Sequence, residues 1–159
     1  MKTIDLAKKN HDYVIQMRRE FHMNPEVSMQ EYNTCKRIKE ELEKMGVEYK
    51  GIAGTGVIAT IKGTKPGKTV ALRGDIDALA VVEENTHDYV SKVHGMMHAC
   101  GHDTHGAMIL GAVKVLNEMK DEIEGTVKFF FQPGEEAGKG VAAMVAAGAL
   151  EGVDGVMVI

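Results

Sequence analysis

The chain has few cysteines. Only Cys35 and Cys100 occur among its 159 residues, which is too few for the disulfide framework of a small secreted domain. We therefore expect a reduced, cytoplasmic compartment. Cys35 lies inside a predicted helix with no histidine or aspartate next to it, so we expect this thiol to be a small buried apolar group.

Long apolar runs and an excess of basic residues are also missing, and we expect no secretory leader. No stretch reaches the apolar length that spans a bilayer, and the first nine residues are amphipathic rather than apolar. The formal net charge is −4 at pH 7, and no basic stripe is present. We therefore expect no membrane insertion and no nucleic-acid partner.

Apolar periodicity and breaker residues predict alternating helices and strands in one domain. Pro25 is expected to end the first helix, Ser28 and Glu31 are expected to cap the second, and Gly46 to follow its last turn. Strand and helix alternate after residue 56, which predicts an α/β fold. The predicted helices are 4–23, 28–45, 104–120 and 138–148, and the predicted strands are 57–61, 70–74, 127–131 and 155–159.

The segment Gly63–Thr69 is rich in glycine and lysine, as phosphate-binding loops are. Three residues lie between Gly63 and Gly67, where that loop has four, and a strand follows instead of a helix N-terminus. We predict instead a hairpin turn with its two lysines in solvent.

The segment from His98 to Asp103 concentrates metal-binding side chains. His98, Cys100 and His102 are spaced two apart, so in an extended segment they would line one wall of a cleft. Imidazole and thiolate suit zinc, or manganese, cobalt and nickel with help from carboxylates. The alternative is a histidine-rich surface loop beside a buried cysteine.

The helix predicted after this segment affects the same side chains. Its N-terminal partial charge is expected to favour the thiolate form of Cys100. His105 lies one turn beyond His102 and is expected near the same cleft, whereas His94 is expected in solvent.

Two carboxylate pairs follow predicted strands, where α/β sheets bind their ligands. Asp75 and Asp77 follow strand 70–74, although such a pair can also only cap a turn. Glu135 and Glu136 follow strand 127–131, and acids also favour a helix N-terminus for structural reasons. The functional reading of the glutamates is one metal ligand beside one general base, the combination that activates a water molecule.

Four blocks together resemble a known family, the aminoacylase branch of the metallopeptidases related to carboxypeptidase G. That branch includes hippurate hydrolases, N-acetyldiaminopimelate deacetylases and plant auxin-conjugate amidohydrolases. Ala80 stands where this family usually has proline, which is expected to alter a turn and not the chemistry. The matching blocks are Arg18 to His22 with Pro25-Glu26, Arg73 to Leu79, Met97 to Asp103, and Phe131 to Glu136.

The resemblance implies a three-layer α/β sandwich with a mixed sheet and a site for two divalent ions, such as zinc, manganese, cobalt or nickel. Cys100, His102 and Glu136 would be metal ligands. Glu135 would be the general base, and Asp77 would accompany the catalytic centre. His98 and His105 become residues around the site, and Asp75 a neighbour of Asp77.

The implied activity is hydrolysis of the amide bond in N-acyl amino acids. The family has two further histidine ligands and a lid domain that this sequence lacks, so residues 1–159 are expected to be the N-terminal part of a catalytic domain. Little activity is expected of this chain alone. The alternative is a non-catalytic metal-binding fragment, or a subunit of a larger assembly. The last strand is expected to leave a sheet edge that pairs with a second copy.

Overall fold

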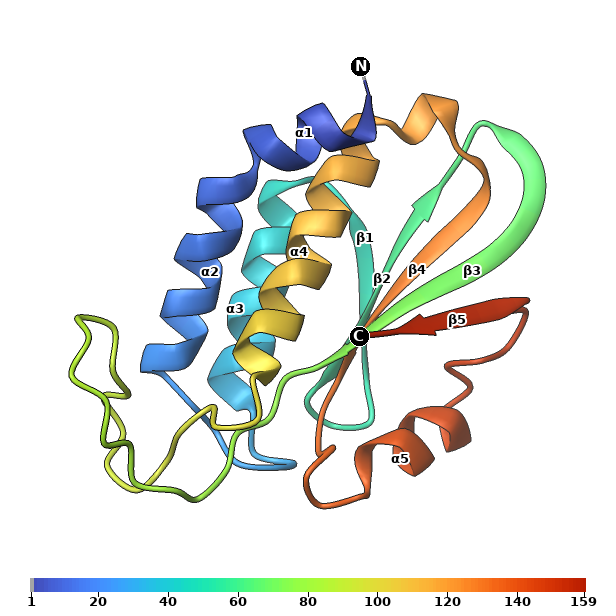
Figure 1. Ribbon diagram of the computed structural model, residues 1–159. Coiled ribbons are helices and arrows are strands. Elements are labelled where there is room, and N and C mark those ends of the chain that lie inside the picture. The colour runs from blue at the N-terminus through green and yellow to red at the C-terminus, as the bar shows by residue number, and fades with distance from the viewer. Residues whose placement is uncertain (1) are drawn as a thin grey trace.

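The computed structural model describes residues 2–159 as a five-stranded sheet flanked by helices (Figure 1). The helices are α1 (Thr3–Lys9), α2 (His11–Met23), α3 (Tyr32–Lys44), α4 (His102–Glu118) and α5 (Gly140–Ala146), with a 3₁₀ turn at Lys120–Glu122. The strands are β1 (Glu48–Ile52), β2 (Gly56–Lys62), β3 (Lys65–Asp75), β4 (Glu124–Gln132) and β5 (Gly155–Val158).

The sheet is mixed, with the strand order β1-β2-β4-β3-β5. The central strand β4 is antiparallel to β2 and parallel to β3, and β5 is parallel to β3. A parallel neighbour requires a long crossover, and α4 lies in the connection between β3 and β4. The α/β fold with a mixed sheet is confirmed.

The hairpin predicted at Gly63–Thr69 is wrong. β2 and β3 do not pair, because β4 lies between them, and β3 already begins at Lys65 opposite Glu124. Lys65 and Lys68 are exposed, as expected. The sequence interpretation also missed β1, whose Glu-Tyr-Lys-Gly-Ile segment is mostly polar because it forms an edge of the sheet.

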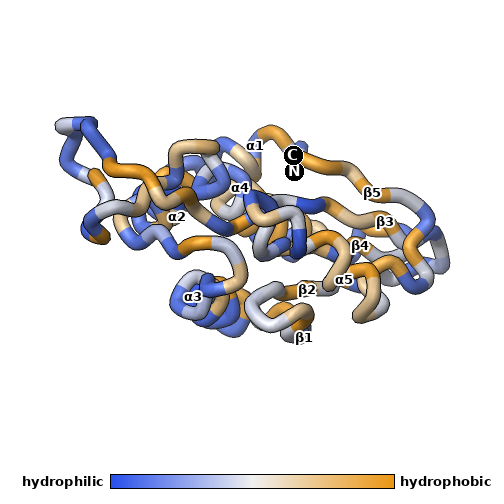
Figure 2. Tube along the Cα trace, turned by 90° about the horizontal axis from the view of Figure 1, so that it is seen from below, coloured by the Kyte–Doolittle hydropathy of each residue, from blue (hydrophilic) through white to orange (hydrophobic). Residues whose placement is uncertain are grey.

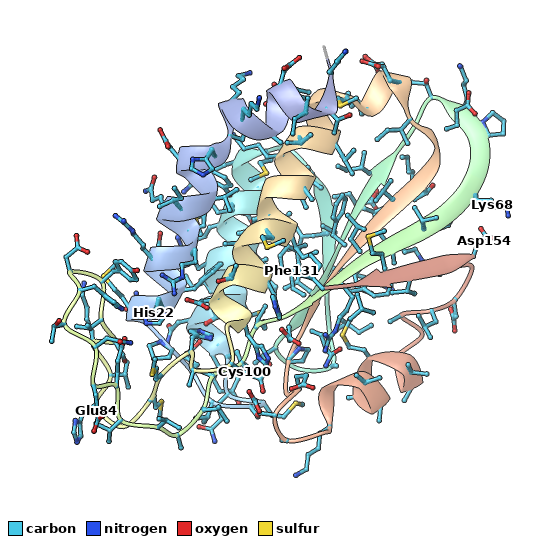
Figure 3. All side chains as sticks on the ribbon, viewed as in Figure 1. His22, Lys68, Glu84, Cys100, Phe131 and Asp154 are labelled. Atoms are coloured by element: carbon cyan, nitrogen blue, oxygen red, sulfur yellow. The ribbon has the colours of Figure 1, made fainter. Side chains whose placement is uncertain are left out.

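Both faces of the sheet are covered. Alternate residues of a strand point to opposite sides, so neighbouring residues of β4 pack into different layers. Phe129 and Phe131 pack into a core with residues of α2, α3 and α4, and Figure 3 shows Phe131 between the helices and the sheet. Phe130 packs on the other face with Met144 of α5 and Ile58 of β2. The predicted three-layer arrangement is therefore confirmed.

The first predicted helix is divided in two at Asn10. The side-chain amide of Asn10 donates to the Leu6 carbonyl over 3.0 Å and to the Glu118 carboxylate over 3.3 Å. Asparagine side chains compete in this way with helical hydrogen bonding. α2 ends at Met23, as Pro25 predicts. None of the helices within residues 2–159 has the length and apolar character needed to cross a bilayer.

The ends of α3 test two predicted caps. Gly46 has a φ of +65°, and the Val47 N–H donates to the Leu42 carbonyl over 3.0 Å, so the predicted C-terminal glycine is confirmed. The capping box is wrong, since α3 begins at Tyr32 and the Ser28 hydroxyl donates elsewhere, to Asp77.

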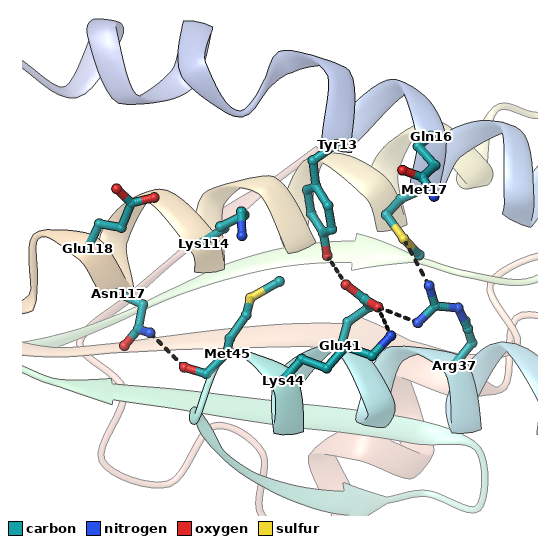
Figure 4. Close-up of a pocket in the computed structure, with 10 residues that line it drawn as sticks. All are labelled: Tyr13, Gln16, Met17, Arg37, Glu41, Lys44, Met45, Lys114, Asn117 and Glu118. Atoms are coloured by element: carbon teal, nitrogen blue, oxygen red, sulfur yellow. Dashed lines mark hydrogen bonds and ion pairs between the residues drawn. The ribbon is translucent and has the colours of Figure 1, made fainter.

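A buried charge joins α2 to α3. The Glu41 carboxylate accepts hydrogen bonds from Tyr13, Arg37 and Lys44, and these residues line a pocket of about 410 Å³ (Figure 4). Burial would raise the pKa of Glu41, but these donors lower it to about 2. None of the candidate metal ligands lines this pocket.

β5 forms the other edge of the sheet. Val156, Met157 and Val158 are 43%, 66% and 62% exposed, and Figure 2 shows this segment as largely hydrophobic. An exposed apolar edge strand can pair with another chain.

We expect Phe129→Ala to lower the free energy of unfolding by ~3–5 kcal/mol, since it opens a cavity in a fully buried core. Tyr32→Ala removes an aromatic ring that is 68% exposed and should change it by less than about 0.5 kcal/mol. Urea unfolding of both variants measures this, and equal losses would contradict the assignment of the core.

Candidate metal centre

Polar side chains converge where the parallel strands β3 and β4 end. Asp75 and Gln132, the last residues of these strands, are partners in the ladder. The chain passes through Asp77 after β3 and through Glu135 and Glu136 after β4, while α4 begins beside them at His102. The predicted convergence of Asp77, His102 and Glu136 at one edge is therefore observed.

Gly101 shapes the segment before α4. It precedes the first helical residue with φ +92° and ψ 11°, a left-handed conformation that glycine adopts without strain. The segment is therefore a turn, and the prediction that it is extended is wrong. His98 is only 4% exposed and lies outside the group formed by Cys100, His102 and Glu136.

The side chains of Cys100, His102 and Glu136 each offer a ligand atom, and these three atoms lie within 4.8 Å of one another. The Nε2 atom of His102 is 3.9 Å from the Glu136 Oε1 atom, which is buried without a hydrogen-bond partner. A buried carboxylate oxygen without a partner is costly. A cation held by these donors would satisfy it, so the residues fit a divalent metal.

Asp77 orients the histidine of this group. The Nδ1 atom of His102 lies 3.0 Å from the Asp77 carbonyl and 3.2 Å from its Oδ1 atom, which leaves Nε2 directed toward Glu136. Metal-binding histidines commonly have such a carboxylate or carbonyl on the second nitrogen. Burial would lower the pKa of His102, but the Asp77 and Asp75 carboxylates together raise it.

The Asp77 carboxylate is itself almost fully satisfied. Its Oδ2 atom accepts from the Ser28 hydroxyl over 2.6 Å and from the Glu136 N–H over 3.0 Å. Burial would raise the pKa of Asp77, but the hydrogen bonds from His102, Ser28 and the backbone lower it to about 2. Asp77 is 1% exposed, so it holds the other groups in place rather than facing solvent.

A second group shares His102. The Nδ1 atom of His105 is 2.6 Å from the Asp75 Oδ1 atom, which lies 3.5 Å from the Nε2 atom of His102. Arg73 binds the other oxygen of Asp75 over 2.8 Å. Asp75 therefore lies closer to the His102 ring than Glu135 and Glu136 do, at 3.5 Å compared with 3.9 Å for each glutamate. Its position at the end of β3 and the i, i+3 spacing of the two histidines were the only indications in the sequence.

Glu135 differs from its neighbour in exposure. Its side chain is 42% exposed and that of Glu136 is 21% exposed, and the Glu135 Oε2 atom lies 3.9 Å from the Nε2 atom of His102. Glu135 is thus near the group and partly open to solvent.

The thiol of Cys100 is exposed, and its electrostatic environment is acidic. A hydrogen bond with Glu136, followed by burial and the charges of Glu136 and Glu135, raises the pKa of Cys100. The prediction that the N-terminus of α4 favours the thiolate is therefore wrong without a bound cation. The carboxylates of Glu136 and Glu135 disfavour the thiolate more strongly than the partial positive charge at the N-terminus of α4, which begins after Gly101, favours it.

Comparisons with known proteins identify similar sequences and structures. The family model described as peptidase family M20/M25/M40 matches residues 71–159. The thermostable carboxypeptidase 2 of Saccharolobus solfataricus is 49% identical over 152 residues, covering 93% of this chain and 39% of the relative. The N-acyl-L-amino acid amidohydrolase of Geobacillus stearothermophilus is 46% identical over 143 residues, covering 89% and 39%.

Among solved structures, a dinuclear metal-binding peptidase of the M20 family from Bacillus subtilis superposes with a TM-score of 0.91 and 44% identity, covering 95% of this chain and 43% of that one. The chain thus spans about two fifths of the length of the proteins it matches.

We expect the chain to hold zinc or cobalt more tightly at about pH 7.5 than at about pH 5, because the Cys100 and His102 donors must lose protons to bind a metal. The pKa of each is raised, so protons compete with the metal for both donors in this pH range, and affinity should increase with pH. Metal analysis after dialysis measures this. Cys100→Ala should lose metal, and Cys35→Ala, which removes the other thiol, should retain it. Equal metal content at both pH values would contradict the site.

Proposed function

Because the chain belongs to peptidase family M20/M25/M40, we propose that it forms the N-terminal part of the catalytic domain of a metal-dependent amidohydrolase. The proposed substrates are N-acyl amino acids, which would be cleaved to a carboxylate and an amino acid. The observation that carries this proposal is the convergence of Cys100, His102 and Glu136, with Glu135 next to them. Its two free thiols suit a reduced, cytoplasmic compartment.

Each residue has a role that follows from its position. Cys100, His102 and Glu136 would hold divalent metal, such as zinc, manganese, cobalt or nickel, and Asp77 would orient His102. Two ions would polarise the amide carbonyl and lower the pKa of the attacking water. Glu135 would accept the proton of that water and return it to the amine nitrogen as the amide bond breaks.

The site in this chain would be incomplete by itself. A catalytic metal needs about three protein ligands and one open position, and two ions would have to share Cys100, His102, Glu136 and the nearby aspartates. The relatives are more than twice as long, so we propose that further ligands and a cover over the cleft belong to the part of the relatives that this chain does not match.

Cobalt binding should distinguish the proposed roles of the two neighbouring glutamates, Glu136 as a metal ligand and Glu135 as the general base. We expect Glu136→Gln to weaken cobalt binding at least about 10-fold, as loss of a charged ligand should. Glu135→Gln should bind cobalt as the unchanged chain does, because a general base does not hold the ion. Isothermal titration of both variants measures this. A Glu135→Gln variant that loses the metal, or a Glu136→Gln variant that keeps it, would reverse the assignment.

We expect this chain alone to release amino acids from N-acetyl and N-benzoyl substrates at less than about 1 s⁻¹, the low end of ordinary enzymes. Losing single groups that stabilise a transition state costs ~10²–10³ in rate. The assay uses excess zinc, cobalt or manganese. Turnover above that rate that disappears in Glu135→Gln would show that the site is complete. Metal binding with no turnover in any longer chain of this protein would favour a non-catalytic metal-binding subunit.

The edge strand β5 should let two copies associate. Met157→Lys places a charge on this edge and should shift the chain toward monomer in sedimentation velocity, because charged edges resist pairing. Val82→Lys is the matched control, since Val82 is 57% exposed on a loop away from the sheet edge. Equal sedimentation of both variants would contradict association through β5.

A further inference from the structure

The loop between β3 and α4 leads directly into the candidate metal centre. Its base is closed by Leu79 and Met97, which exchange two backbone hydrogen bonds of 3.0 Å. Residues 80–96 contain no helix or strand, and Cys100 follows the base after two residues. The position of this loop therefore affects where Cys100 lies.

Glu83 ties the loop to helix α2. Its side chain is only 5% exposed. One carboxylate oxygen accepts from the Ser91 N–H over 2.6 Å, within the loop. The other lies 3.0 Å from the Nε2 atom of His22, on α2. A second tie joins the loop to the end of α2, where the Lys92 N–H donates to the Met23 carbonyl over 2.9 Å.

His22 continues this connection into α4. It is 2% exposed, and its Nδ1 atom lies 2.7 Å from the Asp103 Oδ2 atom. Its two nitrogens therefore each face a carboxylate, Nδ1 that of Asp103 and Nε2 that of Glu83. Arg18 adds a second donor to Asp103 over 2.8 Å. Asp103 directly follows His102 in the first turn of α4.

We propose that Arg18, His22 and Glu83 are positioning residues for the metal centre, which act through Asp103 and the loop. This inference rests on the proposed function, because it concerns the same Cys100 and His102 ligands. The three residues form a latch that fixes the loop before Cys100 and the helical turn that carries His102. None of the three belongs to the group of possible metal ligands formed by Cys100, His102 and Glu136.

A separate metal site in the latch is the competing interpretation. His22, Glu83 and His87 each offer a ligand atom within 4.8 Å of the others. Both nitrogens of His22 already have partners, however, and the Glu83 Oε1 atom also accepts from Asn85 over 3.0 Å. Hydrogen bonds therefore satisfy His22 and Glu83 without an ion, which favours the latch.

The test is a cobalt titration of the 159-residue chain that follows the thiolate-to-cobalt charge-transfer band of Cys100. Glu83→Gln and His22→Gln should each weaken cobalt binding about 10-fold, the effect typical of residues that orient metal ligands. Glu84→Gln and His94→Gln are matched controls at exposed positions of the same loop, and they should bind as the unchanged chain does. Figure 3 shows Glu84 apart from His22.

A variant that carries both Glu83→Gln and His22→Gln distinguishes a latch from general destabilisation. If the two residues act as one connected latch, this double variant should lose as much cobalt affinity as either single variant does. If they act independently, the two losses should add. Additive losses, or a Glu83→Gln variant that binds as tightly as Glu84→Gln, would overturn the proposal. The proposal would also be overturned if the unchanged chain bound cobalt without a thiolate band and Glu83→Gln did not bind it. That cobalt would be bound by His22, Glu83 and His87 instead of by Cys100. If His22→Gln does not fold, Glu83→Gln decides alone.

Hydrogen exchange separates failure of the latch from failure of the proposed function. Without added metal, Glu83→Gln should speed amide exchange at residues 98–104 relative to Glu84→Gln, because the latch holds that turn. A chain without any thiolate–cobalt band would refute the metal centre, and the exchange result would still decide the latch. Unchanged exchange in Glu83→Gln would overturn the proposal.

Discussion

The hydrogen bonds to the buried carboxylate of Asp77 are the interactions on which this site depends. A charge that is 1% exposed must be fully hydrogen-bonded to be tolerated. Its partners come from three distant parts of the chain, at Ser28, His102 and the Glu136 N–H. The same contacts that stabilise the charge therefore hold the ends of β3 and β4 and the start of α4 in one arrangement.

The first turn of α4 divides its side chains between two tasks. His102 and His105 are three residues apart, so they share a face, and their rings stack with centroids 5.6 Å apart beside Asp75. Asp103 points around the helix toward His22 and Arg18. One helical turn thus connects the acidic centre to the helix and loop behind it, and any shift of the turn would move both.

The centre itself is rich in negative charge. Asp75, Asp77, Glu135 and Glu136 lie around His102, and Arg73 neutralises only Asp75. Like charges repel one another at this distance, and a hydrogen bond with Glu136, burial and the charges of Glu136 and Glu135 raise the pKa of Cys100. A divalent cation would remove this repulsion, and binding it would stabilise the folded state by mass action.

The sequence by itself determined the elements and the chemistry that they carry. Periodicity identified most strands and helices, and the spacing of Cys100, His102 and the two carboxylate pairs placed donors at strand ends, because ligand preferences and strand periodicity are local properties. Only the tertiary structure decided the order of the strands, since β4 enters between β2 and β3 through contacts distant in sequence. It also decided that Ser28 binds Asp77 instead of capping a helix, and that His98 is buried outside the group formed by Cys100, His102 and Glu136. Such choices depend on which buried polar groups meet after folding, and no local pattern contains that information.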